Sequence, residues 1–275
     1  MTGMVVDTLH SAWNDRWAVV CRTKAVAVLG ILLAVSFDRR PPTMLKAALG
    51  LATDILGLIM PRMCAGCDQP LYSNEQDLCS ICLADLPRAR MLDDARNPVA
   101  QLFWGRVPLE AAGSFLRFNA GGKVQRMLHR LKYQGDRHVG MHMGRLMGEE
   151  ASACELYKTV DTVMAVPLHP RKERARGYNQ AQVLADGLRE VWPLKPAGRE
   201  LVRVLHTSSQ TKRNRVDRWV NVRTAFTIGK ADALANAHVL LVDDVVTTGA
   251  TLESCAKALL EVPGLKVSVL TAAYA

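Results

Sequence analysis

The sequence has few aromatic residues, no long apolar run and no even spread of cysteines. Aromatic residues make up 5% of its 275 residues, so the core is expected to consist mainly of alanine, valine and leucine. Its seven cysteines are too few and too unevenly spread for a disulfide framework. The apolar stretch AVAVLGILLAVSF, residues 25–37, is shorter than the ~20 residues of a membrane-spanning helix, so no transmembrane span is expected.

The rest of the amino-acid composition is that of a globular chain with more basic than acidic residues. Hydrophobic residues account for 49% of the chain, which is enough for one sizeable domain with a small appendage. The formal net charge is +9, and a basic chain of this kind suits phosphate-rich partners. Charge alone does not distinguish nucleotides from nucleic acid.

Residues 1–43 are set apart from the rest of the chain. A signal peptide fits them poorly, because the region before the apolar stretch is long and contains Asp7 and Asp15, and DRRPP follows where a cleavage site is expected. We interpret them as an upstream extension or a loosely ordered arm, with Met44 as an alternative start; a weak membrane-surface anchor is the other reading. Residues 45–60 have the apolar spacing of a short amphipathic helix.

Four cysteines follow that helix in the pattern C-x2-C-x11-C-x2-C: Cys64, Cys67, Cys79 and Cys82. Each C-x-x-C pair places two thiolates on one tight turn, where they can share a tetrahedral ion. The pattern predicts a structural Zn²⁺ site in a module that ends near residue 90, and an iron–sulfur cluster is the other metal that four cysteines can hold. Four fortuitously buried cysteines are the alternative without a metal.

The C-terminal half alternates strands with helices. Aliphatic strands are predicted at 160–167, 238–244 and 266–275, and helices at 178–192 and 252–262. This alternation is typical of an α/β fold with a parallel sheet covered by helices on both faces. The segment 118–137 reads as a turn followed by a basic helix, whereas residues 91–120 show no clear pattern.

The stretch HVLLVDDVVTTGAT places Asp243 and Asp244 at the end of a predicted strand. Ligands of open α/β sheets bind at such strand ends, and adjacent carboxylates suit the hydroxyl groups of a ribose. A turn and a helix start follow, where free N–H groups and threonine hydroxyls favour a phosphate. Ribose beside phosphate indicates a sugar phosphate. The alternative is that Thr251 only caps the helix and the two acids form a polar turn.

This stretch resembles the ribose-phosphate motif of type I phosphoribosyltransferases, which bind phosphoribosyl pyrophosphate. The resemblance implies that Asp243 and Asp244 hold the ribose hydroxyls. It also implies that the 5′-phosphate is held by the residues of the following turn: Thr247, Thr248, Gly249, Ala250 and Thr251.

Three further segments are similar to the ComF family: LKYQGDR, VPLHPRKERARGYNQAQVLA and HTSSQTKRNRVDRWVNVRTAF. This resemblance covers residues 45–275. It implies a helix and zinc ribbon over 44–90, joined to a phosphoribosyltransferase-like domain over 91–275. Lys132, Tyr133 and Asp136 match a segment of that family without an assignable role.

Two basic segments carry the remaining candidate residues. The resemblance implies that the loop after the strand predicted at 160–167 contacts pyrophosphate. The residues of that loop are Arg171, Lys172, Arg174, Arg176 and Gly177. Arginine forks pair well with phosphate oxygens, although each side chain alone could be a solvated surface charge. The resemblance also implies that a second basic segment, within residues 201–226, forms a flexible loop over the substrate. A nucleic-acid track is the alternative use of that segment, and its candidates are Gln210, Arg213, Arg215 and Arg218.

The resemblance implies a cytoplasmic protein that binds phosphoribosyl pyrophosphate with Mg²⁺. The protein is expected either free in the cytoplasm or at the cytoplasmic face of the inner membrane. Its expected role is in competence, DNA uptake or another process involving single-stranded DNA. The alternative is a metabolic phosphoribosyltransferase with an unidentified nitrogenous acceptor. Thr247 stands where some purine-salvage members carry an acid, and no acceptor pocket is visible in the sequence. Whether the protein is an enzyme therefore stays open.

Overall fold

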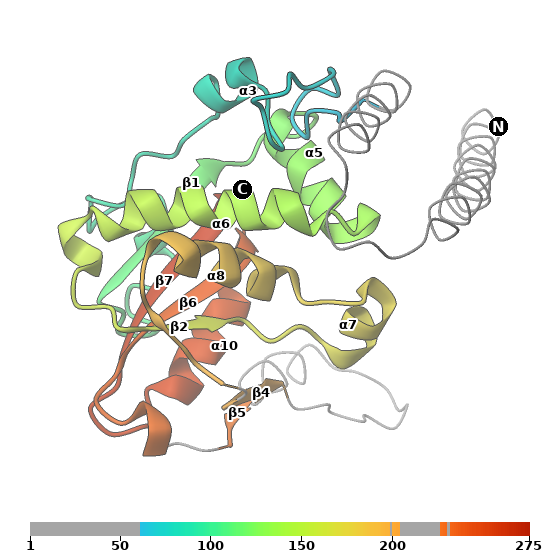
Figure 1. Ribbon diagram of the computed structural model, residues 1–275. Coiled ribbons are helices and arrows are strands. Elements are labelled where there is room, and N and C mark those ends of the chain that lie inside the picture. Colours follow the sequence, from blue (N-terminus) through green and yellow to red (C-terminus); the bar gives the residue numbers. More distant parts are fainter. Residues whose placement is uncertain (1–60, 199, 204–225, 230–231) are drawn as a thin grey trace, which may run out of the picture. The chain divides into compact units, whose positions relative to one another are not determined.

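The computed structural model describes residues 61–198, 200–203, 226–229 and 232–275 (Figure 1). The chain divides into two units, Met1–Met60 and Pro61–Ala275, and the described residues belong to the second. The predicted N-terminal extension and the helix before the cysteines lie outside the described residues. So do four loop candidates: Gln210, Arg213, Arg215 and Arg218.

A five-stranded sheet forms the centre of the described part of the chain, in the order β1-β7-β6-β2-β3 (Figure 1). Every neighbouring pair in it is parallel. The strands are β1 (Ala111–Arg117), β2 (Thr162–Ala165), β3 (Lys195–Pro196), β6 (His238–Val246) and β7 (Lys266–Tyr274). The predicted parallel sheet is confirmed.

Helices cover both faces of the sheet, as the alternation of strands and helices predicted. Along β6, Leu240 and Val242 pack into the core beneath α6 (Arg137–Ser152) and α8 (Gln180–Val191). Val239 and Leu241 face the opposite core, beneath α10 (Ala250–Leu259). Neighbouring strand residues point to opposite faces, so a continuous aliphatic run fills both cores.

The two helices on the first face approach each other closely because of glycines. A Cβ at Gly144 of α6 would collide with the carbonyl oxygen of Leu184, and one at Gly187 of α8 would collide with that of Met141. The helix backbones are therefore in direct contact at these positions, and any side chain would separate them.

Shorter elements complete the second unit. Two strands form a separate antiparallel ribbon, β4 (Leu201–Arg203) with β5 (Phe226–Ile228). Among the described residues, the other helices are α3 (Ser80–Ala84), α4 (Pro98–Gln101), α5 (Lys123–His129), the π-helical η1 (Arg130–Gln134), η2 (Glu155–Tyr157), α7 (Pro170–Arg176) and η3 (Asp232–Leu234). No helix within the described ranges is long and apolar enough to cross a membrane.

Residues 91–137 hold one segment whose pattern predicted its structure and one whose pattern did not. The basic helix predicted within 118–137 forms as α5 and η1, and its four apolar residues are buried: Val124, Met127, Leu128 and Leu131. Residues 91–120, which showed no clear pattern, contain β1. That strand, AAGSFLR, is buried along nearly its whole length and is rich in small residues, so it shows no polar–apolar alternation.

Candidate functional site

The two adjacent acids lie near the carboxyl end of β6, which continues two residues beyond the predicted strand end to Val246. Both side chains are half-buried. The backbone N–H of Asp244 donates to Oδ1 of Asp243 at 2.8 Å. Nζ of Lys132 lies 2.8 Å from Oδ2 of Asp244, so this acid faces a cation from a distant part of the chain.

The turn after β6 depends on a glycine. Gly249 precedes α10 with φ 71°, in the left-handed region, and a Cβ there would lie 3.0 Å from the ring of Phe103. The turn surrounds a small pocket of about 60 Å³, which is space on the order of two water molecules and suits a compact anion. Its lining consists of Asp243 and the run from Val245 to Leu252.

A larger cavity of about 250 Å³ adjoins this pocket, because both are lined by Asp243, Val245 and Thr251. Asp244 also lines it. Around the two acids lie four basic residues and two amides: Lys132, Lys172, Arg176, Arg203, Asn179 and Gln180. The Asp243 carboxylate therefore stands between a compact pocket at a helix start and a wider cavity with cationic walls, and Asp244 lines the wider cavity.

The two acids affect each other's ionisation. Burial, together with the negative charge of Asp244, raises the pKa of Asp243 from 3.8 to about 7. The cations Lys132 and Arg203 and the N–H of Asp244 act in the opposite direction without cancelling the effect. Asp243 thus gains or loses a proton close to neutral pH.

The predicted pyrophosphate residues lie on or beside α7. Of its four basic residues, Lys172 and Arg176 line the 250 Å³ cavity, whereas Arg171 and Arg174 do not appear in its lining. Nη1 of Arg176 donates to Oε1 of Gln180 at 2.7 Å, which directs the guanidinium across the cavity wall. Gly177 ends the helix with φ 79°.

Three residues of the site were not assigned from the sequence. Lys132 belongs to a segment that matched the family but had no role, and Arg203 lies in a short strand with no motif. Arg106 approaches the turn from outside: its Nη1 donates to the carbonyl of Thr248 at 3.3 Å, and its guanidinium pairs with Glu253 of α10. No pattern near Arg106 links it to residue 248, since the contact spans 142 positions.

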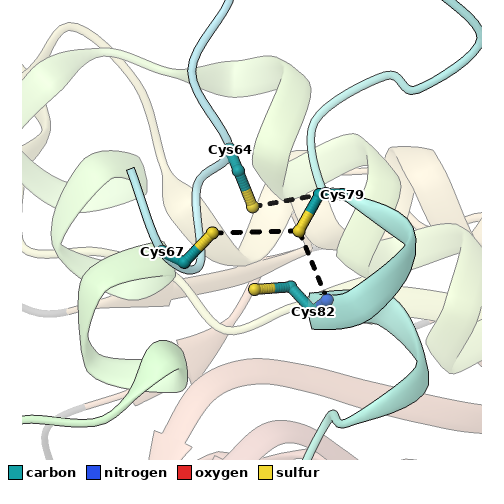
Figure 2. A group of neighbouring side chains, drawn as sticks. All are labelled: Cys64, Cys67, Cys79 and Cys82. Atoms are coloured by element: carbon teal, nitrogen blue, oxygen red, sulfur yellow. Dashed lines mark hydrogen bonds between the residues drawn. The ribbon is translucent and has the colours of Figure 1, made fainter. Parts of the chain in front are cut away.

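The four predicted metal ligands meet in one cluster (Figure 2). Their sulfur atoms all lie within 4.8 Å of one another, and Sγ of Cys67 lies 3.8 Å from Sγ of Cys79. Four sulfurs at about 2.3 Å from a zinc ion are roughly 3.8 Å apart in a regular tetrahedron, so the cluster fits a metal of that size. The group could therefore hold a metal ion such as zinc.

Backbone N–H groups surround the same sulfurs. Those of Cys79 and Gly66 point at Sγ of Cys64, at 3.2 and 3.4 Å. Burial acts to raise the pKa of Cys64, but these N–H groups and that of Cys67 together lower it to about 7. Hydrogen bonds to a sulfur favour its thiolate form, which is the form that binds metals.

The cysteine module is fastened to the helices beside the sheet. Arg126 of α5 donates from Nε to the carbonyl of Gly66 at 2.7 Å, and Arg130 of η1 from Nη1 to that of Met63 at 3.0 Å. Nδ1 of His142 in α6 lies 3.2 Å from Oδ2 of Asp77. The buried cysteines share a core with α5 and α6, so the module and the helices support one another.

Comparison with known proteins finds similar sequences in bacteria, while no protein-family model matches. The chain is 30% identical to Competence protein F of Haemophilus influenzae over 137 residues, covering 48% of this chain and 60% of that one. It is 29% identical to Competence protein ComFC of Bacillus subtilis over 140 residues, covering 50% and 54%. These two matches span less than two thirds of the relatives' own lengths.

A longer match is found with the DNA utilization protein YhgH of Salmonella typhimurium. It is 27% identical over 214 residues and covers 74% of this chain and 92% of the relative. Among solved structures, a glutamine phosphoribosylpyrophosphate amidotransferase from B. subtilis overlaps with a TM-score of 0.36 and 16% identity, over 52% of this chain and 30% of that one. An overlap of that size carries no argument about function.

Proposed function

The chain belongs to the ComF family, and on that premise we propose that it binds phosphoribosyl pyrophosphate, or a related sugar phosphate, at the end of β6. The observation that carries this proposal is the pair of adjoining pockets that share Asp243 and Thr251. One is small and lies at the start of a helix, and the other has cationic walls. A ribose with phosphates at two ends has the same order of groups.

Each part of the ligand has a corresponding part of the site. Asp243 and Asp244 accept hydrogen bonds from the ribose hydroxyls. The 5′-phosphate occupies the 60 Å³ pocket at the start of α10. The pyrophosphate lies in the 250 Å³ cavity against Lys172 and Arg176. Arg171 and Arg174 add positive charge to the same helix, and Gly177 allows the chain to turn back toward Asn179.

We further propose that Mg²⁺ enters with the ligand. Magnesium in proteins usually binds substrate phosphates together with one or two carboxylates and several waters, and the acidic pair offers such carboxylates. When bound, Mg²⁺ neutralises pyrophosphate charge. The contribution of the chain itself is to hold Asp244 against Lys132 and to keep the cationic walls in position.

At the cysteine cluster we propose a structural Zn²⁺, with an iron–sulfur cluster as the other metal that four thiolates can hold. The metal would order the module that caps α5 and α6. Zinc is favoured by the 3.8 Å separation of the Cys67 and Cys79 sulfurs, which fits two thiolates bound to one tetrahedral ion.

The names of two relatives, which refer to competence and DNA utilisation, support a proposal for the cellular role. We propose that the protein handles single-stranded DNA in the cytoplasm, either free or at the inner membrane, and that Arg213, Arg215 and Arg218 of its basic segment contact the DNA. Salt-sensitive binding of single-stranded DNA that is lost when these three become alanine would support this role. Release of pyrophosphate with one defined nitrogenous acceptor would favour a metabolic transferase instead.

Calorimetry tests the ligand directly. Titration of the full chain with phosphoribosyl pyrophosphate and Mg²⁺ should give binding heats that disappear when Asp243 and Asp244 both become asparagine, while circular dichroism stays unchanged. Asp85→Asn is a matched control. Asp85 is a surface acid of the cysteine module, and it pairs with Lys123 of α5. Heats that survive the double substitution would refute the proposal.

A further inference from the structure

A third hollow lies beside the sugar-phosphate cavity. It measures about 400 Å³ and is lined by six residues: Lys132, Tyr133, Gly135, Lys172, Ala175 and Arg176. Lys132, Lys172 and Arg176 also line the 250 Å³ cavity, so the two hollows share one cationic wall. None of the six lining residues is acidic.

Tyr133 provides the aromatic surface of this hollow. Its side chain is 67% exposed, although it is held by a well-anchored segment. The preceding Leu131 is fully buried, and its carbonyl accepts a hydrogen bond from the hydroxyl of Tyr178. Gly135 ends the π-helical turn with φ 71°. The backbone is thus fixed on one side, while the ring of Tyr133 faces outward; π-helical turns of this kind often occur at functional sites.

The neighbours of Tyr133 leave much of its ring free. The ring of His129 lies 4.9 Å away at 43°, and the guanidinium of Arg176 lies 5.4 Å from the centroid of Tyr133. An exposed aromatic ring beside a cationic wall, here Lys132, Lys172 and Arg176, is the arrangement on which bases of single-stranded nucleic acids stack, with the cations neutralising the backbone phosphate.

We propose that Tyr133 is a stacking platform for a nucleobase, with the adjoining phosphate held by Lys172 and Arg176. This inference rests on the proposed function for what occupies the neighbouring cavity, but the contacts that carry it are those of the hollow itself. The base comes either from a free nucleotide or from a nucleotide within single-stranded DNA, since both present a planar ring beside a phosphate. A stacking platform at Tyr133 provides a contact for an acceptor base or for DNA, which no sequence motif revealed.

Two pairs of probes test the proposal on the full chain and separate the two sources. The first pair is a short oligothymidylate and an abasic oligonucleotide of equal length, compared by fluorescence polarisation at one salt concentration. The second pair is AMP and ribose 5-phosphate, compared by calorimetry. In at least one pair, the wild type should bind the base-containing probe roughly 5- to 100-fold more tightly than the base-free probe.

Variants then assign that preference to the ring. Tyr133→Ala should remove it, and Tyr133→Phe should retain it because the phenyl ring still stacks. Tyr72→Ala is the matched control: this tyrosine is 77% exposed on the cysteine module, far from the cationic wall in sequence, and its loss should leave the preference unchanged.

Every outcome decides the question. Preference only with the oligonucleotides identifies DNA as the source, and preference only with AMP identifies a free nucleotide. Preference in neither pair, or preference that survives Tyr133→Ala, overturns the proposal. So does Tyr133→Ala weakening base-containing and base-free probes equally, because the residue would then only shape the hollow. If the wild type shows the base preference but no heat with phosphoribosyl pyrophosphate, the proposed function fails and this inference stands.

Discussion

The four-cysteine cluster and the pocket at the end of β6 are two sites built in opposite ways. The cluster draws all four cysteines from a segment of 19 positions, Cys64 to Cys82, and the two cysteines of each pair are separated by two residues. The proposed sugar-phosphate site draws on η1, α7, β4, β6 and the start of α10, and its lining residues lie up to 119 positions apart, from Lys132 to Thr251. A metal can organise the first site by itself, whereas the second depends on the whole sheet being assembled.

The largest expected effect comes from breaking the cysteine cluster. Structural zinc sites contribute on the order of 10 kcal/mol to folding, so Cys64→Ser or chelation should lower Tm by 10 °C or more in thermal unfolding. Elemental analysis of the reduced, freshly purified protein should give about one zinc per chain. Cys154→Ala, a buried cysteine outside the cluster, is the control and should keep the metal. A protein without metal would refute the zinc site.

The next largest effect is expected on the pH dependence of ligand affinity at the end of β6. Because the pKa of Asp243 is raised to about 7, its carboxylate is increasingly protonated below that pH, and affinity for the sugar phosphate should fall up to tenfold per pH unit there. Above pH 7 the affinity should level off. Calorimetry at several pH values measures this, and a flat profile between pH 5 and pH 7 would contradict it.

The same group makes the free protein less stable as pH rises. The folded state holds the Asp243 proton more tightly than the unfolded chain does, so stability falls as pH rises from about 4 to about 7 and stays low above it. Asp243→Asn removes this loss, and its Tm should exceed that of the wild type at pH 8 by a few degrees and by less at pH 5. A variant that is less stable than the wild type at pH 8 would show that the carboxylate stabilises the fold.

A smaller effect on stability and ligand affinity is expected from a substitution in the turn between β6 and α10. Gly249→Ala combines a positive φ with a Cβ contact of 3.0 Å to Phe103, so it should cost about 1–2 kcal/mol in urea unfolding and weaken sugar-phosphate binding roughly tenfold. Gly121→Ala is its matched control, because Gly121 has φ 74° but no atom within 4 Å of the added Cβ. If both variants behave alike, backbone strain alone accounts for the effect and the contact with Phe103 does not matter.

The smallest effect should come from the outer support of the turn. Arg106→Ala removes the hydrogen bond to the carbonyl of Thr248 and the ion pair with Glu253, both partly exposed. We expect sugar-phosphate affinity to fall a few-fold with little change in stability. Arg117→Ala, an exposed arginine at the end of β1, should change neither. A loss of affinity equal to that of the Asp243 and Asp244 variants would instead place Arg106 in contact with the ligand.

Sequence reasoning was strongest where chemistry is local. The spacing of the four cysteines predicted a cluster that the structure confirms, because two C-x-x-C turns need little help from the rest of the fold. The aliphatic run before Asp243 predicted a buried strand, because a continuous run of valine and leucine is typical of a parallel strand that is covered on both faces. The strand β1, AAGSFLR, escaped notice because it is buried along nearly its whole length and begins with four small residues, so no polar–apolar alternation marks it.

The sequence by itself determined the ligands of the cysteine cluster, the alternation of strands and helices, and the acids with the turn that follows them. Only the tertiary structure decided that Lys132 faces Asp244, that Lys172 and Arg176 rather than their neighbours line the cavity, and that Tyr133 stands beside them. The physical reason is distance along the chain. A motif records contacts within one turn or strand end, whereas ion pairs and cavity walls arise only when the packed sheet brings remote segments together.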